Sequence, residues 1–278
     1  MGHPFGSGCG GAGLWRRPVP RAMAVTRESI LGALRGALEP LPRVLAFFEG
    51  GAIAWGRLDA WSDVDLYVVV EDDAVDDAFR VVDGALADLA RIEQKFTVPH
   101  PPASGIAQAF YRLEGAGPHL LVDLAVLKRS APDKYLEPEI HGNNVVYFDK
   151  AGVTKVPPLD RAAFAAKMGE RLDRLRGRFA MFAPFVEKEL NRGNALEAID
   201  AYRAIVLGSL VEVLRMKHGP VHYGFGMHYV HHELPPDVVA RLVDLAYVRD
   251  PNDLAAKYRE ASAWFREVVQ EPPAAGAA

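Results

Sequence analysis

The stretch FFEGGAIAWGRLDAWSDVDLYVVV, residues 47–70, joins a glycine pair to two closely spaced carboxylates. Asp63 and Asp65 stand at the start of the apolar, β-branched run 66–70, which predicts a short buried strand. Residues two apart on a strand point to the same face, so the two carboxylates lie side by side next to the core. Their repulsion and desolvation are unfavourable unless a cation compensates. Oxygen ligands favour Mg²⁺, which usually takes further oxygens from substrate phosphates.

The glycine pair predicts a seat for such phosphates. The apolar run 44–48 predicts a strand that leads into Gly50 and Gly51, and residues 52–55 can open a short helix. Glycines let the backbone approach a ligand closely, and a helix N-terminus offers unpaired N–H groups to an anion. A Gly-Gly pair or an Asp-x-Asp is a weak signal alone. A strand, Gly-Gly, a short helix and then an acid pair opening the next strand form a much more specific pattern.

A third carboxylate stands in the middle of another apolar run. Residues 119–127 have a buried-strand pattern that contains Asp123. On a neighbouring strand, Asp123 would join Asp63 and Asp65 around a metal pair, and two ions about 4 Å apart can activate an attacking oxygen and stabilise the leaving one. Asp123 could be a third metal ligand, the general base for a substrate hydroxyl, or both. The alternative interpretation is that the three acids are capping or surface residues.

These motifs resemble a known signature. The chain resembles the nucleotidyltransferase fold of polymerase-β-like enzymes in three motifs, which are Gly50-Gly51, Ser62-Asp63-Val64-Asp65-Leu66 and Val122-Asp123-Leu124. Within that superfamily the chain looks most like the small bacterial antibiotic nucleotidyltransferases, which adenylylate aminoglycosides or lincosamides. The commonest form of the motif has Gly-Ser where this chain has Gly50-Gly51, which removes a hydroxyl often used on the nucleotide phosphates. The resemblance implies two Mg²⁺ ions, held by Asp63, Asp65 and Asp123, and ATP or another NTP as co-substrate.

Length and composition exclude several classes of protein. The chain has 278 residues, a mass of 30.4 kDa and 50% hydrophobic residues, which is enough for one large domain or two moderate ones. The net charge is −4, whereas a nucleic-acid-binding protein is usually basic. The single cysteine, Cys9, excludes an internal disulfide. No apolar run approaches the roughly 18 residues of a membrane span, and the N-terminus lacks an apolar signal region, so we expect a cytoplasmic protein.

The pattern along the chain predicts three parts. Residues 1–22 are rich in Gly and Pro and are expected to be disordered. Residues 23–156 alternate helices and strands, with helices at 27–39 and 73–90, which predicts an α+β nucleotidyltransferase domain with a mixed sheet. Residues 157–278 follow the Pro157-Pro158 break and show long 3.6-residue periods, which predict a helical bundle. The resemblance implies that this helical half supplies much of the acceptor pocket.

Three further residues are candidates for contacts with the nucleotide. Ser62 can donate to a phosphate or only cap a turn. Arg57 follows the short predicted helix and could reach a triphosphate, although a solvated surface arginine is the commoner case. Arg203 lies on predicted helix 195–217 at helical spacing from Ile199, Val206, Leu210 and Leu214. A charge within an apolar stripe requires a partner, which can be a phosphate or a salt bridge between the domains. Tyr202 beside it could stack on a base or belong to the core.

Two weaker groups favour ordinary interpretations. His228 with His231 or His232 has a spacing found in some zinc sites, but no His-Glu-x-x-His motif is present, and surface or cleft histidines are the preferred interpretation. Glu93 and Lys95 share one face of a predicted strand that could look into an acceptor site, and solvated residues are the preferred interpretation.

The predicted function is therefore enzymatic. The chain would move a nucleoside monophosphate, AMP from ATP, onto a hydroxyl and release pyrophosphate, with Gly50-Gly51 seating the β- and γ-phosphates. A cationic aminoglycoside would need a strongly acidic pocket, and Glu137, Glu139, Glu187 and Glu189 do not visibly converge in the sequence. A lincosamide, another small hydroxyl compound or a protein side chain remains open, and the last would make the chain a protein-AMPylating enzyme of a toxin–antitoxin type. A nucleotide-binding regulator without turnover is the alternative from another class.

Overall fold

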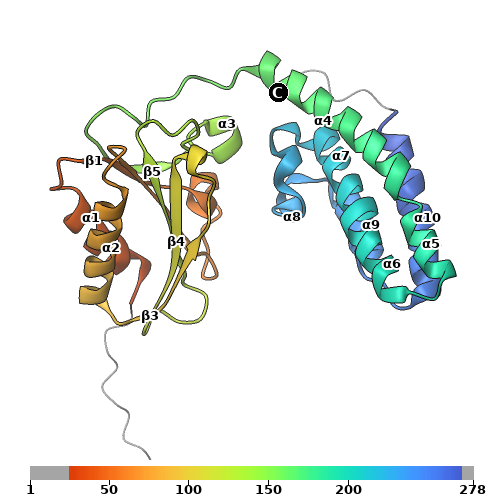
Figure 1. Ribbon diagram of the computed structural model, residues 1–278, viewed down its shortest axis with the longest axis horizontal. Helices are drawn as coiled ribbons and strands as arrows, with labels where there is room; N and C mark the ends of the chain where they lie inside the picture. The colour runs from red at the N-terminus through yellow and green to blue at the C-terminus, as the bar shows by residue number, and fades with distance from the viewer. Residues whose placement is uncertain (1–24, 271–278) are drawn as a thin grey trace, which may run out of the picture. The chain divides into compact units, whose positions relative to one another are not determined.

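The computed structural model describes residues 25–270, which divide into two compact units. The first contains residues 25–136 and 141–155, and the second contains residues 137–140 and 156–270. The segment 1–22, predicted to be disordered, and Cys9 lie outside the described residues. Figure 1 shows the strands of the first unit and the helices of the second.

The first unit is built on a mixed, six-stranded sheet with the order β3-β4-β5-β2-β1-β6. Only β2 and β5 pair in parallel, and the other described pairs are antiparallel. This is the mixed sheet that the sequence predicts. The strands are β1 Val44–Glu49, β2 Val64–Val70, β3 Ile92–Val98, β4 Ile106–Leu113, β5 Val122–Lys128 and β6 Val145–Asp149.

Two helices, α1 (Arg27–Leu38) and α2 (Val75–Leu89), cover one face of this sheet (Figure 1). Alternate residues of β2 and β5 turn toward them, and Val64, Leu66 and Leu124 are fully buried in the shared core. Because strand side chains alternate, Asp65 and Asp123 point to the opposite face. The side chain of Thr26 accepts a hydrogen bond from the Ser29 N–H and caps α1.

Short helical segments connect the strands of the first unit. The 3-10 helix η1 (Gly51–Trp55) follows β1 directly, as the sequence predicts, and η2 (Pro102–Ser104) precedes β4. Helix α3 (Pro138–His141) lies between β5 and β6 in the chain, and its residues 138–140 belong to the second unit.

The second unit is helical, as predicted from the 3.6-residue periods. Its core gathers apolar side chains from most of its helices, and the rings of Phe179 and Phe265 stack with centroids 3.8 Å apart. None of the helices within residues 25–270 combines the length and apolar character that crossing a bilayer requires. The segments are α4 Arg161–Phe182, α5 Phe185–Asn191, α6 Ala195–Ala201, η3 Tyr202–Leu207, α7 Gly208–His218, η4 Pro220–Phe225, α8 Val230–Glu233, α9 Pro236–Ala246 and α10 Pro251–Val268.

The placement of Arg203 in an apolar stripe is wrong. The predicted helix 195–217 contains a π-helical segment, η3, so the 3.6-residue spacing does not hold across residues 202–207. Val206 and Leu210 are buried as expected, but Arg203 is exposed. The sequence argument that Arg203 needs a phosphate or an acidic partner therefore loses its basis. Tyr202 is buried in the core, which was one of its two predicted roles. Its hydroxyl donates to the Leu245 carbonyl oxygen at 2.9 Å.

Candidate active site

The three predicted aspartates come together at the start of the two parallel strands. Asp65 on β2 and Asp123 on β5 are register partners, and Asp63 directly precedes β2. Burial, together with the charges of Asp63 and Asp123, raises the pKa of Asp65 to about 7. The structure therefore confirms that the three acids converge, and it places them where at least one negative charge is poorly compensated.

The Asp123 carboxylate is held by a short polar relay from β4. Gln108 Nε2 donates to Asp123 Oδ1 at 2.6 Å, and His100 Nε2 lies 3.0 Å from Gln108 Oε1. Burial raises the pKa of Asp123, which the hydrogen bond from Gln108 and the proximity of His100 partly offset. Neither residue was predicted from the sequence, although the alternation of β4 places Gln108 on the face opposite to the buried Ala109 and Tyr111.

The glycine pair lies directly against Asp65. The Gly50 N–H donates to the Asp65 carbonyl oxygen at 3.0 Å. Gly51 has φ +63°, and a Cβ built on it would lie 1.8 Å from Asp65 Oδ2. At Gly50 a Cβ would lie 2.8 Å from Asn144 Oδ1. Only glycine therefore fits at position 51 with this backbone, which is a structural reason for Gly-Gly instead of the Gly-Ser form of the motif.

A buried ion pair fixes the loop that carries Asp63. The Arg27 guanidinium, on the first residue of α1, pairs with the fully buried carboxylate of Glu49 and donates to the Asp63 carbonyl oxygen at 3.1 Å. The Tyr147 hydroxyl donates to the other oxygen of Glu49. Because removal of one partner would leave a buried charge uncompensated, this group holds α1, the end of β1 and the Asp63 loop in one arrangement.

Ser62 and Arg57 take local positions near the acids. The Ser62 hydroxyl donates to Asp59 Oδ1 at 2.9 Å, and it accepts from the Asp59 N–H at 3.0 Å, so it closes the turn before Asp63. Arg57 is half-buried, with its guanidinium carbon 5.5 Å from the centroid of the Trp55 ring. Arg203 belongs to the helical unit. The structure thus brings together the three aspartates and the glycine pair.

An aromatic group continues from Asp65 along β2. Tyr67 lies two residues after Asp65, and its ring packs against Tyr135, with centroids 5.7 Å apart. Tyr135 meets the ring of His141 edge-on at 5.4 Å. Burial and then the charges of Asp65 and Asp123 raise the pKa of the Tyr67 hydroxyl. Tyr67 therefore remains neutral next to the acidic cluster.

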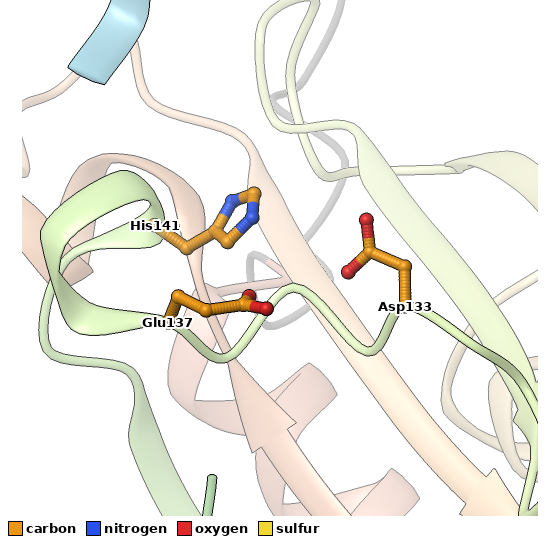
Figure 2. Close-up of side chains that lie close together, drawn as sticks. All are labelled: Asp133, Glu137 and His141. Carbon is orange, nitrogen blue, oxygen red and sulfur yellow. The ribbon is translucent and has the colours of Figure 1, made fainter. Parts of the chain in front are cut away.

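A smaller mixed cluster lies near Tyr135. Asp133, Glu137 and His141 each offer one ligand atom, and these atoms lie within 4.8 Å of one another (Figure 2). Two carboxylates and an imidazole are ligands that divalent metals accept. Glu137, which did not visibly converge with other acids in the sequence, therefore lies close to one acid, Asp133, in the structure. No second feature of residues 25–270 marks this cluster as a metal site.

One histidine of the helical unit, His222, is held by protein oxygens. His222 is buried, with Nδ1 at 3.0 Å from Glu233 Oε1 and Nε2 at 2.8 Å from the Ile140 carbonyl oxygen. The same glutamate pairs with the fully buried guanidinium of Arg215. Both nitrogens of His222 are therefore engaged by protein oxygens.

Comparison with known proteins gives structural matches only. No family model matches the chain. No curated protein matches it by sequence. An aminoglycoside 6-adenyltransferase from Bacillus subtilis is 15% identical, with 88% of this chain and 90% of that chain covered and a TM-score of 0.31. A spectinomycin adenyltransferase from Enterococcus faecialis, solved with ATP and spectinomycin, is 13% identical, with 87% and 96% covered and a TM-score of 0.34. Both of these solved proteins are adenyltransferases.

Proposed function

We propose that the protein is an Mg²⁺-dependent nucleotidyltransferase that moves AMP from ATP onto the hydroxyl of a small molecule and releases pyrophosphate. The observation that carries this proposal is the convergence of Asp63, Asp65 and Asp123, with burial and mutual repulsion raising the pKa of Asp65 to about 7. Such an arrangement is unfavourable by itself. A divalent cation would compensate the charge of the carboxylates.

The donor set fits Mg²⁺. All three candidate ligands are carboxylates, and Mg²⁺ binds through oxygen ligands while keeping positions for substrate phosphates. Asp63 and Asp65 would hold the metal, with Asp123 as a further ligand. When bound, Mg²⁺ supplies neutralisation of the charge that develops on the phosphate oxygens.

Asp123 is the proposed base for the acceptor. As the acceptor oxygen forms its bond to the α-phosphorus, the bond from that phosphorus to the pyrophosphate oxygen breaks. The hydroxyl proton passes to the Asp123 carboxylate, and pyrophosphate leaves. Gln108 donates to one oxygen of this carboxylate and fixes its orientation, so the other oxygen can face the hydroxyl.

The glycine pair is the proposed seat of the phosphates. Gly50 and Gly51 lie at the end of β1, on the side of Asp65 away from Asp123. Side chains are absent there, so the backbone can approach an anion closely. Ser62 and Arg57 are close to the acids in the chain, and contacts of either with the triphosphate remain part of the proposal.

The test is Mg²⁺-dependent binding and turnover of ATP. Wild-type protein is expected to be stabilised by ATP only with Mg²⁺, and to release pyrophosphate in a screen of mixed hydroxyl acceptors. The double variant Asp63→Asn/Asp65→Asn should lose both responses, whereas the matched control Asp88→Asn, an exposed position of α2, should keep them. An unchanged thermal shift in the double variant would place the metal elsewhere. Binding without pyrophosphate release from any acceptor would favour the non-catalytic regulator.

A further inference from the structure

The face of the sheet that carries the aspartates also carries an aromatic row. Phe96 on β3 is the register partner of Phe110 on β4, which is the partner of Asp123, which is in turn the partner of Asp65. Partners in register on adjacent strands point to the same side of a sheet. The row therefore runs Phe96, Phe110, Asp123, Asp65 across the open face.

Neighbouring residues confirm which way these rings point. Lys95 points to the helix-covered face, where its Nζ lies 2.7 and 2.8 Å from the carboxylate oxygens of Asp83 on α2. Tyr111 is fully buried on that same side. Phe96 and Phe110 alternate with them and so lie on the open side, where Phe96 is 58% exposed and Phe110 is half-buried. A large exposed aromatic side chain beside an acidic cluster is a candidate contact for a ligand.

The order of the strands separates the two ends of the row. The glycine pair lies beyond Asp65 at the end of β1, whereas Phe110 and Phe96 lie beyond Asp123 on β4 and β3. In an in-line displacement the attacking oxygen enters opposite the leaving pyrophosphate. With phosphates seated at the glycine end, the acceptor arrives from the Phe110 end. At about 4.8 Å per strand, Phe110 lies roughly 5 Å and Phe96 roughly 10 Å across the sheet from Asp123.

The charges of this part of the face are informative as well. The open-face positions of β3 and β4 near the row contain no acid; they are Gln94, Phe96, Val98, Gln108, Phe110 and Arg112. Arg112 is exposed and lies two residues after Phe110 on the same face. A guanidinium beside the rings repels a cationic ligand and tolerates a neutral or anionic one.

We infer that the acceptor is a hydroxyl compound without a positive charge at this contact, and that it lays an apolar ring-shaped face on Phe110 and Phe96 while its hydroxyl meets Asp123. This inference rests on the proposed function and names the substrate class of the same site. It distinguishes the acceptor from a polycation, which would need carboxylates where β3 and β4 carry amides, phenyl rings and a guanidinium.

Direct binding tests the inference independently of turnover. The probe is benzyl alcohol, with ethanol as the hydroxyl lacking an apolar ring, titrated into the full chain labelled with ¹³C on phenylalanine rings. Ring signals of Phe96 and Phe110 are expected to shift with benzyl alcohol and not with ethanol. Phe110→Ala should weaken benzyl alcohol binding roughly ten-fold, because the ring contact and its burial are lost together. Phe182→Ala, an exposed phenylalanine of the helical unit, is the matched control and should not change it.

A second comparison tests the charge. 4-(Aminomethyl)benzyl alcohol is a cation at pH 7 and should bind the wild type more weakly than benzyl alcohol, and Arg112→Glu should reverse that order. Shifts absent from Phe96 and Phe110 in a folded wild type, or a cationic probe that binds at least as well as the neutral one, would overturn the inference. The Asp63→Asn/Asp65→Asn variant should still bind benzyl alcohol, so a failure of the metal site and a failure of the aromatic contact give different results.

Discussion

Replacing Asp65 with asparagine is expected to stabilise the metal-free protein at pH 8. The pKa of Asp65 rises from 3.8 to about 7 on folding, because of burial and then the charges of Asp63 and Asp123. A rise of about three units, at 1.36 kcal/mol each, corresponds to about 4 kcal/mol of destabilisation when the group is ionised. Asparagine keeps the size of the side chain and removes the charge, so we expect a gain of about 2 to 4 kcal/mol in the free energy of unfolding.

The sign of the pH dependence follows from the same shift. The folded state holds the Asp65 proton more tightly than the unfolded state does, so this group lowers stability as pH rises from about 4 to about 7. Above about pH 7 its contribution is constant, and below about pH 4 it vanishes. The free energy of unfolding of the wild type, minus that of the Asp65→Asn variant, should therefore decrease between about pH 4 and pH 7 and stay constant at higher pH. Adding Mg²⁺ at pH 8 should stabilise the wild type and leave Asp65→Asn nearly unchanged.

The assay is urea unfolding at pH 4, 6 and 8, with EDTA or with Mg²⁺. Hydrogen exchange of the β2 and β5 amides under the same conditions is the second measurement of stability. Asp149→Asn is a control of opposite sign. Burial raises the pKa of Asp149, but hydrogen bonds from Thr154 and from nearby backbone N–H groups outweigh it and lower that pKa. The control should therefore be less stable than wild type at pH 8. An Asp65→Asn variant that is less stable than wild type in EDTA at pH 8 would refute the reasoning.

Two further predictions concern the immediate neighbours of Asp65. Gly51→Ala should destabilise the sheet unit by about 3 kcal/mol or more and abolish stabilisation by Mg-ATP, because its Cβ would lie 1.8 Å from Asp65 Oδ2. The control Gly56→Ala has the same φ of +63° and nothing within 4 Å of the added Cβ, so it should lose only about 1 kcal/mol in urea unfolding. Equal losses in the two variants would contradict the clash. Asp123→Asn should lower kcat by about 10²- to 10⁴-fold in a pyrophosphate-release assay with little change in the Kd of Mg-ATP, with a smaller loss for Gln108→Ala, and an Asp123→Asn variant that turns over normally would exclude both proposed roles of that acid.

The strands and the three acids could be predicted because they depend on local pattern. Residues 64–70 and 122–127 are β-branched or apolar apart from their acids, so their period fixes which face Asp65 and Asp123 share. The pairing of two strands that are far apart in the chain was inferred only because both carry an acid next to a core. The parallel register that makes Asp65 and Asp123 direct partners comes from the structure.

The supporting residues could not be predicted because they depend on contacts between distant segments. The pairing of Arg27 with Glu49 requires the relative position of α1 and β1, and the bond from Gln108 to Asp123 requires the register of β4 on β5. Arg203 fails for a different reason. A periodicity argument assumes 3.6 residues per turn, and the π-helical segment breaks that assumption within one turn.

The two faces of the sheet answer different requirements, and this explains how the fold tolerates three converging acids. Residues of β2 and β5 that point to α1 and α2, such as Leu66 and Leu124, are fully buried and supply the stability of the unit. The acids that alternate with them on the open face can destabilise the unit without unfolding it. This is because β2 and β5 are the two central strands and each pairs with a strand on both sides. Substitutions on the helix-covered face should therefore change stability first, and substitutions on the open face should change ligand binding first. The same division is why an aromatic row can extend from Asp123 toward the edge strand β3 without contributing to the core.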